Sequence, residues 1–178
     1  MENNIKLREL KKEDVPALED VIRKTWNYDR FATPKTARKL AKVYLATCLT
    51  NQTYTRVAEV NGVPVGLILG KDIEKHHCPP KYRLRQISAL CGLLISKEGR
   101  EILNFYKNVD DIDNRLLRQC SKDYKGELAL FALSPEYRGL GIGKMLFRCL
   151  LAYMESRSIS DFYLYTDTSC NFGFYEHQ

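Results

Sequence analysis

The chain has 178 residues, of which 44% are hydrophobic and 28% charged, and its formal net charge is +6. A chain of this length and composition can bury a sizeable core, so we expect one soluble domain spanning residues 1–178. It has no apolar run long enough to cross a bilayer and no signal-peptide character at its start, which predicts a cytoplasmic protein with no membrane partner. Its lysine and arginine residues are dispersed rather than clustered, which argues against nucleic acid as a partner.

The N-terminal part of the chain is predicted to form a strand and two amphipathic helices. Residues 5–10 form the strand, and Glu13 and Asp14 lead into the first helix, which tolerates Pro16 in its first turn. The second helix starts at Thr33 and Pro34, a capping residue followed by proline. The buried stripes are predicted to be Val15, Leu18, Val21 and Ile22 in the first helix, and Ala37, Leu40, Ala41, Tyr44, Leu45 and Cys48 in the second.

Three aromatic residues, Trp26, Tyr28 and Phe31, occupy the connection between these helices. They could touch a substrate, but packing beneath a loop is the commoner role of such residues, and we favour it here. After the second helix, Asn61-Gly62 separates two strand-like segments, residues 54–60 and 63–71. This dipeptide is a strong hairpin signal, so we expect two antiparallel strands.

Residues 72–125 are rich in helical signals, and three helices are predicted there. Their apolar stripes are Leu84, Ile87, Cys91 and Leu94; then Ile102, Phe105, Tyr106 and Val109, after a cap at Ser96; then Ile112, Leu116, Leu117 and Cys120. These stripes are too apolar to be left in water, so we expect the helices to pack against the rest of the chain, as a lid or as a dimer contact. A run of aspartates, Asp110, Asp111 and Asp113, could attract a cationic amine or simply form a solvated helix start.

Neither a disulfide framework nor a metal site is expected. The six cysteines are scattered without a Cys-x-x-Cys pair, which favours reduced, packed thiols. His76, His77 and Cys78 are adjacent rather than spaced as metal ligands usually are, so a loop before Pro79 is the better interpretation.

Residues 126–157 are predicted to form a buried strand, a glycine-rich turn and an amphipathic helix. In the strand, Leu128, Leu130 and Ala132 would face one side of the sheet and Ala129, Phe131 and Leu133 the other, so that helices cover both faces. Glu127 places a carboxylate at the strand's entry. The helix would turn Ile142, Met145, Leu146, Cys149, Leu150 and Tyr153 toward the core.

The turn between them suits a phosphate-bearing ligand. Its glycines let the backbone approach a ligand closely, and the first N–H groups of the helix, with the positive end of its dipole, attract an anion. The spacing of Gly139, Gly141 and Gly143 excludes a P-loop, and Lys144 stands where the dinucleotide fingerprint needs a third glycine. Arg138-x-x-Gly141-x-Gly143 after such a strand closely resembles the acyl-CoA pyrophosphate loop of the GNAT family of N-acetyltransferases.

This resemblance implies the GNAT fold, an α/β architecture in which helices flank a mixed central sheet, with residues 72–125 as a helical insertion before the central strand. It also implies that acetyl-CoA binds through Arg138, Gly139, Gly141, Ile142, Gly143 and Lys144, and that backbone N–H groups near Phe131 and Leu133 pair with the pantetheine and hold the oxyanion. Residues 162–165 are predicted to form a further strand and 168–175 the start of the last helix. In the family's second motif an asparagine binds pantetheine; here Asn171 is favoured over Thr168 because it lies one helical turn before Tyr175.

The resemblance further implies an N-acetyltransferase that moves an acetyl group from acetyl-CoA directly to a primary amine of a small molecule or protein. An amine with a pKa of about 10.4 must lose a proton before it attacks. Glu127 matches the family's base, although a solvated carboxylate at a strand end would look the same, and Tyr175 matches the acid that protonates the thiolate. The alternative is a catalytically weak module that binds acyl-CoA or docks a partner; the presence of both residues favours the enzyme.

GNAT folds normally continue beyond the final helix into two more strands, which this sequence does not supply before Gln178. We therefore expect a truncated chain that binds CoA, transfers acetyl groups weakly and self-associates, with a homodimer possible, because an unpaired sheet edge invites association. Alternatively, the insertion covers that edge or a second copy pairs with it.

Overall fold

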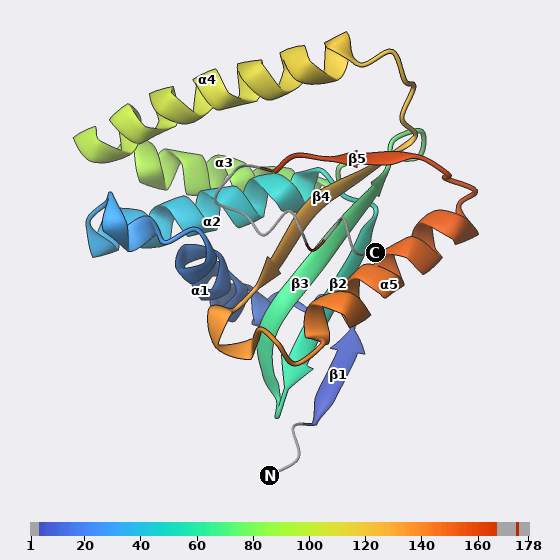
Figure 1. Cartoon of the computed structure of the whole chain (residues 1–178). Coiled ribbons are helices and arrows are strands. Elements are labelled where there is room, and N and C mark those ends of the chain that lie inside the picture. The colour runs from blue at the N-terminus through green and yellow to red at the C-terminus, as the bar shows by residue number, and fades with distance from the viewer. Residues whose placement is uncertain (1–3, 167–173, 175–178) are drawn as a thin grey trace.

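The computed structural model of the chain describes residues 4–166 and residue 174, and within one helix it leaves the side chains of residues 105–111 and 114 undescribed. Its centre is a five-stranded sheet in the order β1 to β5, with helices on both faces (Figure 1). The strands are β1 Ile5–Arg8, β2 Tyr54–Val60, β3 Val63–Asp72, β4 Gly126–Leu133 and β5 Phe162–Leu164. The first four pair antiparallel and β5 runs parallel to β4, so the sheet is mixed, as the resemblance to the GNAT family implies.

Helices divide between the two faces of this sheet. On one face α1 (Val15–Thr25) and α2 (Pro34–Thr50) pack over a core that includes Leu67 and Leu69 of β3. On the other face α5 (Ile142–Ser156) covers Ile68 and Leu128. The helices α3 (Pro80–Leu94) and α4 (Lys97–Gln119) lie outside α2, so α2 is sandwiched between the sheet and the insertion (Figure 1). Three short 3-10 turns, Lys12–Asp14, Tyr28–Arg30 and Pro135–Tyr137, complete the described elements.

Local sequence signals account well for the first half of the chain. In α1 the predicted residues Val15, Leu18, Val21 and Ile22 are the buried ones, and in α2 the predicted stripe is buried except for Tyr44, which is partly exposed. The hairpin turns at Asn61 (φ 51°) and Gly62 (φ 86°), both left-handed, which is the primed turn that Asn-Gly favours. Trp26 packs its ring against Tyr44 with centroids 5.0 Å apart, and Tyr28 is buried, so these aromatics do pack beneath the loop; Phe31 is exposed.

The insertion differs from its prediction in two ways. Residues 97–119 form one long helix, so the predicted second and third helices are a single α4, capped at Ser96, whose side chain accepts a hydrogen bond from Gly99 N. In α3 the buried residues are Ala89 and Leu93, whereas Leu84, Ile87 and Leu94 are exposed. The predicted apolar stripe of α3 is therefore wrong, because the helix packs on α2 through a different face, which carries Ala89, Leu90 and Leu93.

A β-bulge in β4 changes which side chains face which layer. Leu69 pairs with Leu130 while Gly70 pairs with Leu128, so one residue, Ala129, is extra on β4. As a result Leu128 faces α5 while Leu130 lies in the core under α1 and α2. The simple alternation predicted for this strand is wrong at this point. The bulge also places Glu127 on the α2 side, opposite to Leu128.

The core-facing side of α5 is also rotated from its predicted position. Ile142, Leu146 and Leu150 are buried as expected, but Phe147 and Met154 are buried as well, while Met145 is exposed. The face of α5 that is buried against the sheet is therefore wider than the narrow stripe that was predicted. This leaves Met145 beside the solvent at the start of the helix.

Candidate active site

The turn that joins β4 to α5 is open and depends on two glycines. Gly139 (φ 80°) and Gly141 (φ 76°) both take left-handed backbone conformations that residues with a Cβ rarely adopt. A Cβ built at either position would meet no atom within 4 Å, so open space lies above both. Gly143, by contrast, has an ordinary helical conformation, and its Cβ would come 3.5 Å from Phe131 Cζ. A ligand can therefore approach the backbone closely at Gly139 and Gly141.

The start of α5 presents donors to that open space. Gly141 is the N-cap residue, and the first residues of the helix, Ile142, Gly143 and Lys144, have backbone N–H groups with no intrahelical acceptor. The Ile142 side chain is fully buried, which anchors the helix start, whereas Arg138 and Lys144 are exposed. Backbone donors, the helix dipole and two cations thus meet at one point, which is the arrangement that phosphate groups favour.

The edge of β4 beside this turn is free of strand pairing in the described part of the chain. β5 pairs only with Gly126, Glu127 and Leu128, and no described strand continues that pairing toward Leu133. Ser134 N donates to Val65 O of β3. In an antiparallel pair the N–H groups of alternate residues point toward the partner strand, so this bond shows which residues of β4 face β3. By alternation, the N–H groups of Phe131 and Leu133 point away from β3, toward the open edge. The Leu133 carbonyl accepts a hydrogen bond from Thr25 Oγ1 at 3.4 Å.

Glu127 is the buried centre of a polar cluster on the other side of β4. Glu127 is only 7% exposed, so it is not a solvated carboxylate at a strand end. Oε1 accepts a hydrogen bond from Asn51 Nδ2 at 2.9 Å, and Oε2 accepts from Tyr163 OH at 3.1 Å and from Lys71 Nζ at 3.5 Å. Lys71 Nζ also donates to Asn51 Oδ1 at 2.6 Å.

Sheet register explains how these groups meet. Lys71 of β3 and Tyr163 of β5 are the direct cross-strand partners of Glu127, one on each side. Asn51 follows the last residue of α2, which brings its amide over the sheet from the helix layer. Three elements, namely β3, β5 and the end of α2, therefore hold in place the carboxylate that β4 carries.

Burial at this cluster changes the acidity of its neighbours. Desolvation and then the Glu127 charge raise the pKa of Tyr163 well above its usual range, so its phenol remains protonated and donates to the carboxylate. The same two causes raise the pKa of the Cys48 thiol, which lies on α2 one turn before Asn51, to about 12. Both shifts keep the Tyr163 phenol and the Cys48 thiol uncharged at neutral pH.

A chemical test of this burial uses the cysteines. The thiolate is the nucleophile in alkylation, so in the native protein at pH 8 Cys48 should react with iodoacetamide roughly 10³-fold more slowly than a thiol with an ordinary pKa, and burial adds to this protection. Cys91 and Cys120 are exposed and serve as internal references. Mass spectrometry of peptides after timed alkylation measures the rates, and in urea all three should converge. Equal native rates would contradict the buried cluster.

Three predicted site residues, Thr168, Asn171 and Tyr175, lie outside the described residues. Conversely, sequence reasoning missed Asn51, Lys71 and Tyr163. The signal for Lys71 and Tyr163 was present, since both lie in predicted strands, but their alignment with Glu127 depends on strand order and register. Asn51 stands directly after a predicted helix and had no signal of its own.

Comparison with protein families matches residues 16–177 to the Acetyltransferase (GNAT) family. The chain belongs to this family. The match spans the turn, the Glu127 cluster and the insertion, and the mixed sheet with helices on both faces agrees with it. Comparison with curated protein sequences finds no match.

Solved structures show the same fold at low identity. PH1933 from Pyrococcus horikoshii OT3 has a TM-score of 0.62 and 17% identity, with 98% of this chain and 85% of that one covered. The PaiA N-acetyltransferase of Thermoplasma acidophilum in complex with coenzyme A has a TM-score of 0.52 and 18% identity, covering 98% and 86%. A GNAT family acetyltransferase of Brucella melitensis in complex with acetyl-CoA has a TM-score of 0.50 and 15% identity, covering 98% and 82%.

Two features are absent from the described residues. None of the described helices combines the length and the apolar character needed to span a bilayer. The described side chains also form no group of three or more His, Cys, Asp or Glu residues that could hold a metal ion. His76, one of the three adjacent candidates, instead hydrogen-bonds through Nε2 to Thr50 O at 2.8 Å.

Proposed function

We propose that this GNAT acetyltransferase moves an acetyl group from acetyl-CoA directly to the primary amine of a small molecule or protein. The observation that carries the proposal is the placement of an open, glycine-dependent helix start and a buried, fully oriented carboxylate at the same strand, β4. Two relatives in the fold comparison are bound to CoA or acetyl-CoA, which supports that donor.

The donor would bind along the open edge of β4. Its pyrophosphate would rest on the N–H groups at the start of α5, with Arg138 and Lys144 beside it. Its pantetheine arm would pair with the backbone of Phe131 and Leu133 as an added strand would. The same N–H groups would stabilise the oxyanion that forms when the amine attacks the thioester carbonyl.

Glu127 would accept the proton that the amine loses, directly or through a water molecule. A carboxylate offers about four acceptor positions, and the described residues use three of them, two at Oε2 and one at Oε1. We therefore assign proton acceptance to Oε1, which has the spare position. Lys71, Asn51 and Tyr163 would orient the carboxylate. When the carbon–sulfur bond breaks, Tyr175 would supply the proton to the CoA thiolate.

Two measurements on the purified protein test the proposal. Calorimetry should show acetyl-CoA binding, and a thiol-release assay with a panel of amines should show CoA release that depends on the amine. Binding without amine-dependent release would favour the alternative of an acyl-CoA-binding or partner-docking module. Absence of binding would contradict the donor assignment itself.

A further inference from the structure

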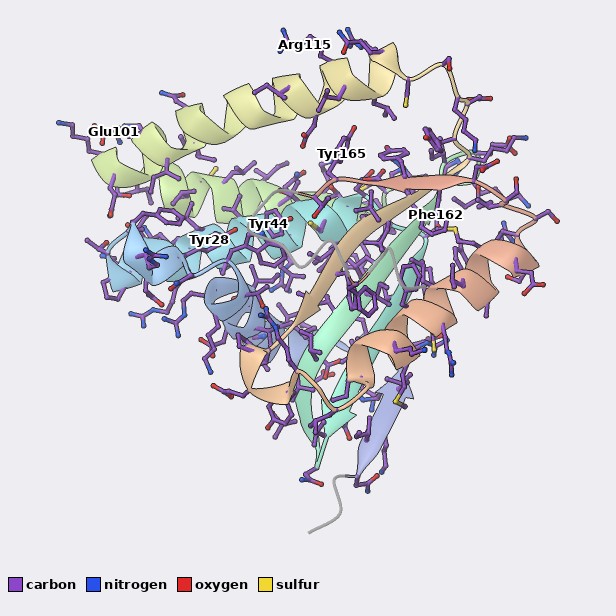
Figure 2. The ribbon with its side chains drawn as sticks, viewed as in Figure 1. Tyr28, Tyr44, Glu101, Arg115, Phe162 and Tyr165 are labelled. Carbon is purple, nitrogen blue, oxygen red and sulfur yellow. The ribbon has the colours of Figure 1, made fainter. Side chains whose placement is uncertain are left out.

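The insertion forms one wall of a cavity whose lining residues have no role in the acetyl transfer proposed above. It has a volume of about 580 Å³ and lies between α2, α3 and α4, which is a size suited to a small molecule. Its walls include Leu40, Val43 and Tyr44 of α2, Leu90 and Leu94 of α3, and Leu103 of α4. Tyr28 and Tyr44, both labelled in Figure 2, contribute aromatic surface.

Polar contacts hold the walls of this cavity in place. Lys39 Nζ of α2 donates to Gly92 O of α3 at 2.7 Å. The Glu98 carboxylate at the start of α4 accepts hydrogen bonds from the hydroxyls of Thr33 and Thr36 and from Thr33 N. Arg85 of α3 forms a 2.9 Å ion pair with Glu19 of α1. The cavity is therefore preformed by the fold, as ligand sites usually are.

The cavity reaches toward Glu127 along α2. Thr47, which lines it, is one helical turn before Asn51, whose amide holds the Glu127 carboxylate. Tyr44, another lining residue, lies one turn before Cys48. The pKa of the Cys48 thiol is raised by desolvation and by the Glu127 charge. Asn51 and Glu127 do not line the cavity themselves, so a molecule bound there would extend about one more turn along α2 to reach the carboxylate.

Aromatic side chains also connect Glu127 to the insertion on the β5 side. Tyr163, which donates to Glu127, packs edge-on against Tyr165 with ring centroids 5.3 Å apart. Tyr165 OH in turn donates to Asp113 O of α4 at 3.3 Å, and its side chain points toward α4 in Figure 2. Aromatic rings therefore line part of the space around Glu127 on this side, where desolvation and then the Asp113 charge raise the pKa of the Tyr165 phenol.

The charge of the residues that line the cavity limits which amines can bind in it. The cavity is lined in the described structure by no aspartate or glutamate, and its one charged lining residue is Arg100, a cation. Polyamines and aminoglycosides carry several ammonium groups, each of which needs a carboxylate partner when it leaves water. A monoamine with an aromatic or aliphatic body brings a single ammonium group, and that group would lie at Glu127.

We propose that the cavity is the acceptor site and that it takes a small monoamine with an aromatic or branched aliphatic body. This inference rests on the proposed acetyl transfer, but the binding it asserts can be measured without turnover. The apolar body would fill the space between α2, α3 and α4. Its amine would extend past Thr47 to Glu127.

The test uses three probe amines: 2-phenylethylamine, glycinamide, which is an amine without an apolar body, and spermidine, a polyamine. The variants are Leu94→Trp and Asn104→Trp, which narrow the cavity from opposite walls at exposed positions of α3 and α4. Leu84→Trp, at another exposed leucine of α3 that does not line the cavity, is the matched control. Amine binding is measured by ligand-observed NMR and transfer by CoA release.

The wild type should bind 2-phenylethylamine at least about tenfold more tightly than spermidine, since one mismatch in an apolar pocket has effects of this size. Both cavity variants should raise the KM and Kd for 2-phenylethylamine by about tenfold and leave glycinamide unaffected, and Leu84→Trp should change neither. Preference for spermidine, or equal behaviour of Leu94→Trp and Leu84→Trp, would overturn the inference while leaving acetyl transfer intact. Cavity-dependent binding without any CoA release would support the site and reject the proposed reaction.

Discussion

The Glu127→Gln variant is expected to lose about 10²- to 10⁴-fold in kcat, the range for removal of a general base. Gln keeps the size of the side chain, and its single amide oxygen can still accept a hydrogen bond from either Asn51 or Tyr163, but it cannot take a proton from an attacking amine. Acetyl-CoA affinity should be unchanged, because Glu127 lies on the α2 side of β4 and the proposed cofactor site lies at its open edge. CoA release measured across the pH range, with calorimetry for the donor, checks both statements.

A second glutamate provides the control for this variant. Glu59 lies in β2, is partly buried and forms a 2.7 Å ion pair with Arg8, so Glu59→Gln also removes a paired carboxylate from a strand. It should leave kcat at the wild-type value. A wild-type rate for Glu127→Gln over the whole pH range would assign the base elsewhere. Equal losses in both variants would indicate a general structural effect instead.

Local patterns in the sequence predict a large part of this fold. The buried stripe of α1, the start of α2 at Pro34 and the Asn61-Gly62 hairpin all depend on residues close in sequence, so a single segment contains the necessary information. The glycine turn belongs to the same class, because Gly141 has a left-handed backbone that only a few residues adopt easily. The family assignment followed from this turn and its flanking elements.

What the sequence did not predict depends on contacts between distant segments. The bulge at Ala129 leaves no mark on an apolar strand in which both faces are buried, yet it decides that Leu128 and Leu130 face opposite layers. The single α4 was divided in the prediction at the aspartates near residue 110, although no glycine or proline breaks the helix there. The cluster around Glu127 required the register of β3 and β5, which no local pattern specifies.

The α3 helix illustrates a further limit. Its sequence carries apolar residues on several sides, so periodicity alone favoured Leu84, Ile87 and Leu94 as the buried stripe. The structure buries Ala89 and Leu93 against α2 instead, and Leu94 lines the cavity. Tertiary packing therefore favours the face that carries Ala89, Leu90 and Leu93, a choice that the helical period does not decide. The same choice leaves Leu94 free to line the proposed acceptor site.

Gly141→Val is expected to abolish acetyl-CoA binding while the domain stays folded. A β-branched residue at φ 76° is strained by about 1–2 kcal/mol, so the turn would shift to relieve it and the N–H groups at the start of α5 would lose their common direction. A turn that keeps its shape would instead place the valine methyl groups in the open space above the backbone, where the pyrophosphate would approach. Either outcome removes the close backbone contact, and calorimetry with acetyl-CoA measures the loss.

Gly62→Val separates this effect from backbone strain as such. Gly62 has a similar left-handed conformation (φ 86°), also with nothing within 4 Å of a built Cβ, but it lies in the β2–β3 hairpin. Both variants should lose a similar amount of stability, about 1–2 kcal/mol in thermal or denaturant unfolding, yet only Gly141→Val should lose acetyl-CoA. Unchanged affinity in folded Gly141→Val would show that the turn does not hold the donor. Equal loss of binding in both variants would show that strain anywhere in the domain, rather than the shape of this turn, controls it.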